Sequence, residues 1–256
     1  MMDFIVAMHT DKGIKKNTNQ DSLFVKVANT SQGKVAFSVV CDGMGGLSKG
    51  ELASATVLTA FSNWFTGSFS HILNSDFSDE DIKTQWHNLV IRESNRIMEY
   101  GQRNGVSLGT TATVLLIAKG RYYIMNIGDS RAYEIGDRVS QITKDQTFVA
   151  REIERGNMTP EQAKSDPRRS VLLQCVGASK VIEPDFFVGE AKKNVVYMLC
   201  SDGFRHEITE SEILRYLNKD VLLDETSMKD NACYLVELNK QRMELDNISV
   251  TLIRTF

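Results

Sequence analysis

Short, strongly apolar runs and longer amphipathic stretches follow one another along the chain. The run Val35–Cys41 is continuous and rich in β-branched residues, which is typical of a strand buried on both faces. Similar runs flank short polar turns such as Lys119-Gly120, and such pairs predict antiparallel hairpins. The predicted strands are Phe4–Met8, Ser22–Val27, Val35–Cys41, Gly109–Ala118, Arg121–Ile127, Ala132–Ile135, Arg138–Ile142, Glu183–Val188, Asn194–Cys200 and Ile248–Arg254.

The amphipathic stretches predict helices, with a loop between residues 67 and 77. Capping-box patterns at Ser78–Asp81 and Thr209–Glu212 mark two helix starts. Strands in hairpins and helices in long pairs indicate an α+β domain, in which helices pack over a sandwich of antiparallel sheets. The predicted helices are Glu51–Phe65, residues 78–103, residues 209–217 and Thr226–Lys240.

Residues 144–177 interrupt this pattern with short, polar, helix-like pieces. Thr159-Pro160 followed by Gln162 combines a capping threonine, a proline at the first helical position and a capping-box glutamine. An insertion of this kind between two strands predicts a mobile segment on the surface, here called the flap.

Composition restricts the number of domains, the kinds of partner and the location, but it does not indicate a function. The 256 residues show no linker, so one domain over 1–256 is expected. The net charge of −3 argues against a nucleic-acid partner. No apolar run is long enough to span a bilayer, and the N-terminus does not resemble a signal peptide. Four unpaired cysteines, with Cys41 and Cys200 at strand ends, favour reduced thiols and a cytoplasmic location.

Acidic residues recur at the ends of the predicted core strands. Asp42, Asp129 and Asp202 each follow an apolar run, Asp246 precedes the last strand, and Asp21 precedes the second. If these strand ends share one edge of the sandwich, their carboxylates converge, and clustered like charges need cations. Oxygen ligands favour Mg²⁺ or Mn²⁺, and the histidines and cysteines lack the spacing of a zinc site. The pattern indicates a metallohydrolase.

A plainer interpretation stays open at this point. Asp-Gly is a common turn dipeptide, and Gly43, Gly45 and Gly46 after Asp42 form a flexible turn whatever the function. Recurrence of the pattern, rather than any single turn, favours the metal site.

Six short motifs occur in a fixed order along the chain: Gly13-x-x-Lys16-x-x-Asn19-Gln20-Asp21, Asp42-Gly43-Met44-Gly45-Gly46, Gly109-Thr110-Thr111, Gly128-Asp129-Ser130-Arg131, Ser201-Asp202-Gly203 and Asp246-Asn247. In order and rough spacing they resemble the motifs of the metal-dependent serine/threonine protein phosphatases of type 2C. The stretch Ile142–Val149, with Gly156 to Arg169 after it, resembles the bacterial branch of that family. The resemblance extends from about Thr10 to Ile253.

The resemblance implies two stacked antiparallel sheets flanked by helices, with residues 144–177 as the flap. It also implies that Asp42 bridges two Mn²⁺ or Mg²⁺ ions and that the Gly43 carbonyl binds one of them. Asp202 and Asp246 would hold one ion and Asp21 the other, directly or through water. A possible third metal would use Asp129 and Ser170, whereas Gly109–Thr111 and Arg131 would support the site.

The implied reaction is hydrolysis of phosphoserine and phosphothreonine. A metal-bridging hydroxide would attack the phosphorus in line, with no phosphoenzyme, so Asp42 and Asp202 would act through metal-bound water. Lys16 would bind the phosphate. Phosphoproteins are the implied partners, among them a bacterial serine/threonine kinase and its substrates, and a monomer is the default.

Three positions depart from the family pattern. Lys16 stands where the family usually has arginine, and lysine cannot make the forked contact to phosphate, which predicts weaker phosphate binding. Met44 replaces the histidine that eukaryotic members often use as general acid, so a metal-bound water would serve. Gln20 replaces a glutamate found in many members, which removes a potential ligand beside Asp21.

Three other functions compete with this one. A non-catalytic phosphoprotein-binding relative would lack metal acids, but all the core acids are present. A phosphodiesterase or nuclease would need a basic track, which the net charge of −3 opposes. A purely structural sandwich would gain no thermal stability from Mn²⁺.

Overall fold

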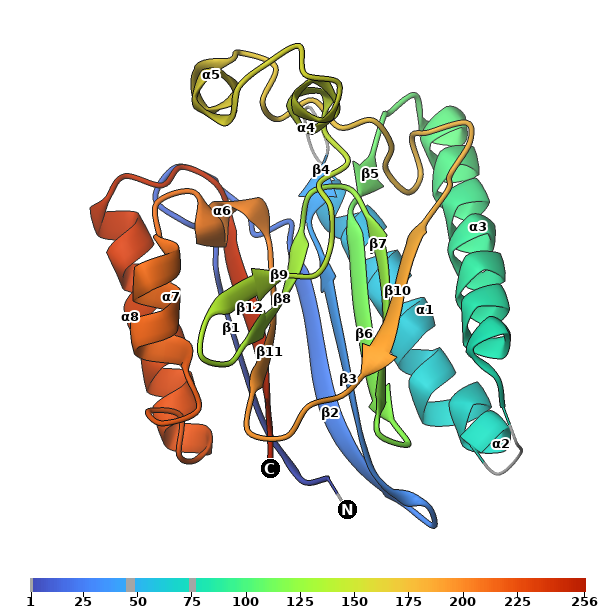
Figure 1. Cartoon of the computed structure of the whole chain (residues 1–256). Helices are drawn as coiled ribbons and strands as arrows, with labels where there is room; N and C mark the ends of the chain where they lie inside the picture. Colours follow the sequence, from blue (N-terminus) through green and yellow to red (C-terminus); the bar gives the residue numbers. More distant parts are fainter. Residues whose placement is uncertain (1, 45–48, 74–76) are drawn as a thin grey trace.

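Two five-stranded antiparallel sheets form the centre of the molecule (Figure 1). The computed structural model describes residues 2–44, 49–73 and 77–256. One sheet has the order β1-β12-β11-β8-β9, the other the order β10-β7-β6-β3-β2, and β4 and β5 form a short separate pair. The strands are β1 (Phe4–Asp11), β2 (Ser22–Thr30), β3 (Gly33–Cys41), β4 (Gly43–Met44), β5 (Gly109–Thr110), β6 (Ala112–Ala118), β7 (Arg121–Ile127), β8 (Arg131–Ile135), β9 (Val139–Gln141), β10 (Asp185–Glu190), β11 (Val196–Cys200) and β12 (Ile248–Thr255).

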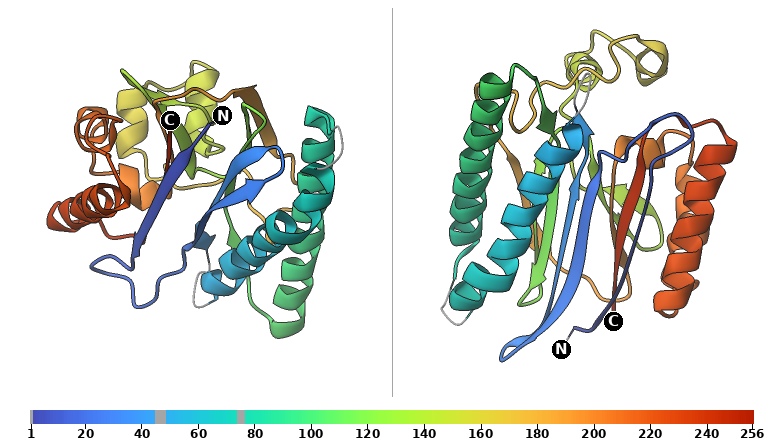
Figure 2. Two further views of the ribbon diagram at one scale, coloured as in Figure 1. Left: turned by 90° about the horizontal axis from the view of Figure 1, so that it is seen from below. Right: turned by 180° about the vertical axis from the view of Figure 1, so that it is seen from behind.

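Helices cover the outer face of each sheet (Figures 1 and 2). Helices α1 and α3 flank the sheet that contains β3, and α7 and α8 flank the sheet that contains β12. This αββα arrangement confirms the predicted fold class. The helices are α1 (Gly50–Asn63), the π-helical turn η1 (Trp64–Ser68), α2 (Phe69–Leu73), α3 (Asp79–Asn104), α4 (Phe148–Glu154), α5 (Pro160–Ser165), α6 (Asp202–Arg205), α7 (Glu210–Leu217) and α8 (Glu225–Gln241).

Strand β3 shows why the central run is apolar on both faces. Phe37 and Val39 pack against the helical layer, whereas Ala36 and Val40 pack between the two sheets. Because alternate residues of a strand point to opposite faces, both halves of the run are buried. Cys41 is a buried free thiol, as expected from its place in the run.

Several predicted boundaries were wrong. β1 continues to Asp11 through the predicted turn, because His9–Asp11 pair with β12. Residues 69–73 are helical rather than loop, because Phe69 and Leu73 are buried in the core. The predicted strand Gly109–Ala118 is broken at Thr111, and its first two residues pair with β4 instead of β3.

The capping predictions were confirmed. Ser78, Thr159 and Thr209 each accept a hydrogen bond from the third residue of the helix that follows, and in each the capping box is complete. No helix within the described ranges is long and apolar enough to cross a membrane.

Candidate active site

Strand pairing brings the predicted acids to one edge of the sandwich. Ser22 pairs with Cys41, so Asp21 and Asp42 lie at neighbouring strand ends. In the other sheet Cys200 pairs with Val250, so Asp202 lies beside the start of β12, near Asp246. Asp129 follows β7 after a single glycine. The chain therefore collects acids from both sheets at the edge below α4 and α5 (Figure 1).

Burial, together with repulsion from neighbouring carboxylates, raises the pKa values of Asp21, Asp42 and Asp129. Burial and the charges of Asp202 and Asp246 raise the pKa of Asp21 to about 7. Burial and the charge of Asp202 likewise raise the pKa of Asp129 to about 7. For Asp42, burial and the four neighbouring carboxylates raise the pKa well above its ordinary value. The chain thus holds more negative charge here than its own cations neutralise.

The donor set fits hard divalent cations. Within the described residues, both carboxylate oxygens of Asp21 and Oδ1 of Asp202 are buried without a hydrogen-bond partner. Such oxygens are costly to bury unless a cation binds them. Among the same residues, no three His, Cys, Asp or Glu side chains are placed so that they could together hold a metal ion. The fit therefore rests on the unpartnered oxygens and on ligand chemistry, which favours Mg²⁺ or Mn²⁺.

Lys16 forms a close ion pair with one of the acids. Its Nζ lies 2.7 Å from Asp246 Oδ1. Asn247 holds the loop that carries it, because its side-chain amide donates to the carbonyls of Lys12 and Thr18, and its Oδ1 accepts from the Gln20 N–H. In the Asp-Asn motif, Asp246 thus supplies an acid, and Asn247 holds the loop before Asp21 by hydrogen bonds.

The Gly-Thr-Thr motif fixes the backbone at Asp42. The Asp42 N–H donates to Thr111 Oγ1 at 2.9 Å, and the Asp42 carbonyl accepts from the Thr111 N–H and from Thr110 Oγ1. Gly43 is closely packed, since a Cβ there would lie 2.3 Å from the Gly50 carbonyl oxygen. These contacts support the structural role predicted for the motif. Gly45 and Gly46 of the predicted turn lie outside the described residues.

Sequence reasoning missed His206 and Glu244 at this edge. His206 Nδ1 lies 3.1 Å from Glu244 Oε2, and its Nε2 lies 3.6 Å from Asp202 Oδ2. Burial would lower the pKa of His206, but the hydrogen bond to Glu244 and the charge of Asp202 raise it above its ordinary value. No motif marked His206, but its place four residues after Asp202 on the same helical turn was a usable signal.

A second missed network lies beside Asp129. Arg131 makes a two-pronged contact to Asp145, with both distances 2.7 Å. Arg205 Nη2 lies 3.5 Å from the same carboxylate and 3.7 Å from Asp129 Oδ2. Arg131 was predicted to support the site. Its contact with Asp145 connects it to the start of the flap. The long sequence separations hid Asp145 and Arg205.

An open cavity of about 450 Å³ gives access to these groups. Ser170 of the flap lines the cavity, as do Asp202 and Asp246, whereas Asp21, Asp42 and Asp129 are not among its lining residues. The lining residues are Lys15, Lys16, Asn17, Arg169, Ser170, Asp202, His206, Glu244, Leu245 and Asp246.

Comparison with known protein families gives one match that covers most of the chain. Residues 8–229 match the family model described as protein phosphatase 2C. The chain is 30% identical over 247 residues to the serine/threonine protein phosphatase PstP of Mycobacterium tuberculosis, covering 95% of this chain but 43% of PstP. It thus spans less than half the length of that relative.

Two further comparisons cover nearly the whole of both chains. The serine/threonine phosphatase stp of Listeria welshimeri is 30% identical over 251 residues, which cover 95% of this chain and 93% of stp. A crystal structure of the PstP catalytic domain in complex with two manganese ions superposes with a TM-score of 0.79. It is 27% identical and covers 100% of this chain and 99% of that one.

Proposed function

This chain belongs to the protein phosphatase 2C family, and on that premise we propose that it hydrolyses phosphoserine and phosphothreonine in proteins, with Mn²⁺ or Mg²⁺ as cofactor. The proposal rests mainly on one observation. Acids from both sheets converge at one edge, and buried carboxylate oxygens of Asp21 and Asp202 have no hydrogen-bond partner among the described residues. The manganese-bound PstP structure supports the choice of metal.

We assign the acids to the metals as follows. Asp42 would hold both core ions, the Gly43 carbonyl would contact one of them, and Asp202 would share an ion with Asp246. When bound, the ions supply Lewis-acid chemistry that activates water and neutralises charge on the phosphoryl group. The remaining proposed ligands are Asp21 at the core and Asp129 with Ser170 for a third ion.

The rest of the edge would bind and orient the phosphoryl group. Lys16 lines the cavity and carries a positive charge at neutral pH, so its ammonium group can donate to a phosphoryl oxygen. Thr110 and Thr111 keep Asp42 in place through its backbone. Asn247 keeps the Lys16 loop next to Asp246.

We further propose a single phosphatase domain over 1–256 that acts as a monomer, with residues 144–177 as its flap. One copy carries every acid assigned above, which supports the monomer. Acting on phosphoproteins, it would oppose a serine/threonine kinase. The buried free thiols of Cys41 and Cys200 support a reducing, cytoplasmic setting.

The test is phosphate release from a phosphothreonine peptide, with Mn²⁺ and with chelator, by the wild type and Asp202→Asn. We expect release that requires Mn²⁺. In the variant it should fall by more than the roughly 10–100-fold loss that is typical of a group that only supports a metal ligand, because Asp202 is assigned to the metals themselves. The matched control is Asp137→Asn on an exposed hairpin turn, which should retain wild-type activity.

Metal binding can be measured apart from catalysis. Mn²⁺ should raise the melting temperature of the wild type by mass action, and less so that of Asp202→Asn. Phosphate release that persists in chelator, or a wild type inactive on the peptide, on p-nitrophenyl phosphate and on phosphoproteins, would contradict the proposal.

A further inference from the structure

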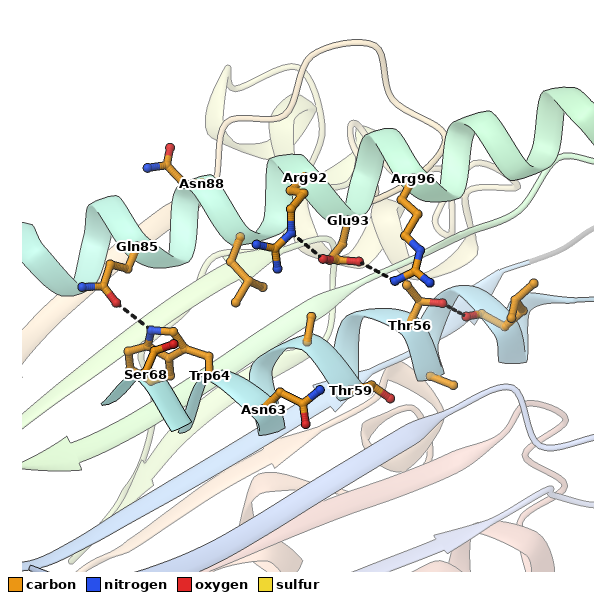
Figure 3. A pocket seen from close by; sticks show the side chains of 14 residues that line it. Thr56, Thr59, Asn63, Trp64, Ser68, Gln85, Asn88, Arg92, Glu93 and Arg96 are labelled. Atoms are coloured by element: carbon orange, nitrogen blue, oxygen red, sulfur yellow. Dashed lines mark hydrogen bonds and ion pairs between the residues drawn. The ribbon is translucent and has the colours of Figure 1, made fainter. Parts of the chain in front are cut away.

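A second, larger hollow lies on the outer surface, between α1 and α3 (Figure 3). It is an open groove of about 890 Å³. Its sides come from α1, η1 and the middle of α3. The lining residues are Leu52, Ala55, Thr56, Thr59, Ala60, Asn63, Trp64, Ser68, Gln85, Asn88, Leu89, Arg92, Glu93 and Arg96.

Small side chains on α1 keep the groove open, and polar groups border it. Ala55, Thr59 and Ala60 leave room that larger residues would fill. At one end Trp64 Nε1 donates a hydrogen bond to Gln85 Oε1 at 2.8 Å (Figure 3). This bond fixes the orientation of the Gln85 side-chain amide and leaves its nitrogen available as a donor. Amide and hydroxyl groups along a groove are suited to hydrogen bonds with a peptide backbone.

Two arginines point along the opposite wall. Arg92 Nε donates to Glu93 Oε1 at 2.8 Å, and Arg96 Nη1 lies 3.6 Å from Glu93 Oε2 (Figure 3). The Glu93 side chain is only 5% exposed, whereas those of Arg92 and Arg96 are 69% and 77% exposed. Each guanidinium uses one nitrogen for Glu93 and carries further N–H donors in solvent. The buried carboxylate thus orients two cations whose other donors can bind an anion.

The charge of the groove differs in sign from that of the whole chain. Among the described residues that line it, the charged ones are Arg92, Glu93 and Arg96, which sum to +1, whereas the chain carries −3. This local excess of positive charge favours an acidic occupant.

The dimensions fit an extended chain rather than a small molecule. From Leu52 to Ser68 the wall rises about 24 Å at ~1.5 Å per residue. An extended peptide of about seven residues covers that length at ~3.3 Å per residue. Leu52, which is 38% exposed, offers an apolar contact at the end nearest the acids. There α1 begins at Gly50, which packs directly against Gly43 of the candidate active site.

We propose that the groove between α1 and α3 binds an extended, acidic segment of the phosphoprotein substrate, with Arg92 and Arg96 pairing with its carboxylates. The inference rests on the proposed phosphatase function and adds a preference for substrates that carry acidic residues some distance from the phosphorylated residue. The groove would hold the substrate while the phosphoryl group occupies the site at the sheet edge.

The experiment compares two phosphothreonine peptides that differ only in a seven-residue tail, which is rich in glutamate in one and in glutamine in the other. Each pair is made twice, once with the tail before the phosphorylated residue and once with the tail after it. The test variant is Arg92→Gln/Glu93→Gln/Arg96→Gln, which removes the buried carboxylate together with its cations and so avoids an unpaired buried charge. Arg103→Gln is the matched control, since Arg103 lies on the same helix, is 78% exposed and does not line the groove.

We expect the wild type to show a KM about tenfold lower for the glutamate tail, and the triple variant to lose this difference. The kcat values and the hydrolysis of p-nitrophenyl phosphate should not change, and Arg103→Gln should behave as the wild type. Thr59→Trp, which fills the groove and keeps all three charges, should also raise the KM for the glutamate tail.

Equal KM values for both tails in the wild type, or a preference that survives in the triple variant, would overturn the proposal. If the triple variant and the wild type differ in sedimentation coefficient, the groove binds a second copy of the chain, and this result would also overturn the proposal. Failure of the phosphatase function itself is distinguishable, because the wild type would then not hydrolyse p-nitrophenyl phosphate. Anisotropy of a labelled, unphosphorylated glutamate-tail peptide tests the groove without catalysis.

Discussion

At the scale of single residues, Lys16 is one of the three positions that depart from the family pattern. Burial would lower the pKa of Lys16, but the hydrogen bond to Asp246 and the charges of Asp42 and Asp202 raise it. The ammonium group is therefore charged at neutral pH and lies among the acids. A lysine in this place supplies a point charge, whereas arginine would offer two parallel donors.

We expect Lys16→Arg to lower the KM for a phosphothreonine peptide several-fold, because a guanidinium can hold two phosphoryl oxygens at once. Steady-state kinetics with saturating Mn²⁺ would measure it. Lys15→Arg is the control, since Lys15 also lines the cavity but has no ion pair with Asp246 among the described contacts. An unchanged KM would mean that Lys16 does not contact the phosphate.

The buried carboxylates predict an unusual pH dependence for the metal-free protein. Asp21 and Asp129 have folded-state pKa values of about 7, above the roughly 3.9 of an unfolded aspartate. Between these values the folded state binds more protons than the unfolded state, so the free energy of unfolding falls as pH rises from about 4 to about 7.

In chelator the melting temperature should therefore fall between pH 5 and pH 7.5, whereas Mn²⁺ should reduce or reverse the fall because it binds the ionised acids. Each 1 kcal/mol corresponds to a shift of about 2–4 °C in a chain of this size. Calorimetry at both pH values would measure it, with Asp21→Asn expected to flatten the metal-free profile. A melting temperature that rises with pH in chelator would refute the assignment.

At the scale of elements, the site depends on close contact between α6 and the loop before β12. A Cβ on Gly203 would lie 2.2 Å from the Asn247 carbonyl oxygen and 3.4 Å from Asp246 Cβ. The glycine of the Ser-Asp-Gly motif thus lets two acids, Asp202 and Asp246, approach each other from different elements.

Gly203→Ala should separate these elements, cost about 1–3 kcal/mol of stability and weaken Mn²⁺ binding. Chemical denaturation and Mn²⁺ titration by calorimetry would measure the two effects. Gly136→Ala serves as the control, because a Cβ there would make an ordinary 3.5 Å contact with Val195. Equal behaviour of the two variants would show that the loop adapts to the added carbon.

The flap is anchored at both ends. Arg131 holds Asp145 at its start, and Val176 near its end exchanges backbone hydrogen bonds with Thr110. Because Thr110 also contacts the backbone of Asp42, the flap and the acid share one support. Two short capped helices lie between these anchors, and Ser170 reaches the cavity from there.

At the scale of the whole molecule, a buried polar contact joins the two sheets. Ser38 Oγ and Thr251 Oγ1 lie 2.7 Å apart, and both residues are almost fully buried. The surrounding layer between the sheets is apolar, so each hydroxyl depends on the other for its hydrogen bond.

Ser38→Ala should lower the free energy of unfolding by about 1–3 kcal/mol, because it leaves the Thr251 hydroxyl buried without this partner. The double variant Ser38→Ala/Thr251→Val should recover most of that loss, since both polar groups are then gone. Urea denaturation of the single and double variants would measure the coupling. Additive losses would show that the two hydroxyls act independently.

The sequence predicted most strands and helices, because their signals are local. Apolar runs, turn residues and capping boxes act within a few positions, and Ser78, Thr159 and Thr209 cap helices as predicted. The errors occurred where distant contacts decide, as at residues 69–73, where burial in the core makes a helix of a predicted loop.

What the sequence by itself determined was the order of the elements, the family and the identity of the acids at strand ends. Only the tertiary structure decided which side chains meet there: Glu244 with His206, Asp145 with Arg131 and Arg205, and Lys16 with Asp246. The physical reason is distance along the chain, since Lys16 and Asp246 come together only when β1 pairs with β12. The groove between α1 and α3 has the same origin. It forms where two helices pack side by side on one sheet, and the sequence pattern of either helix alone does not predict it.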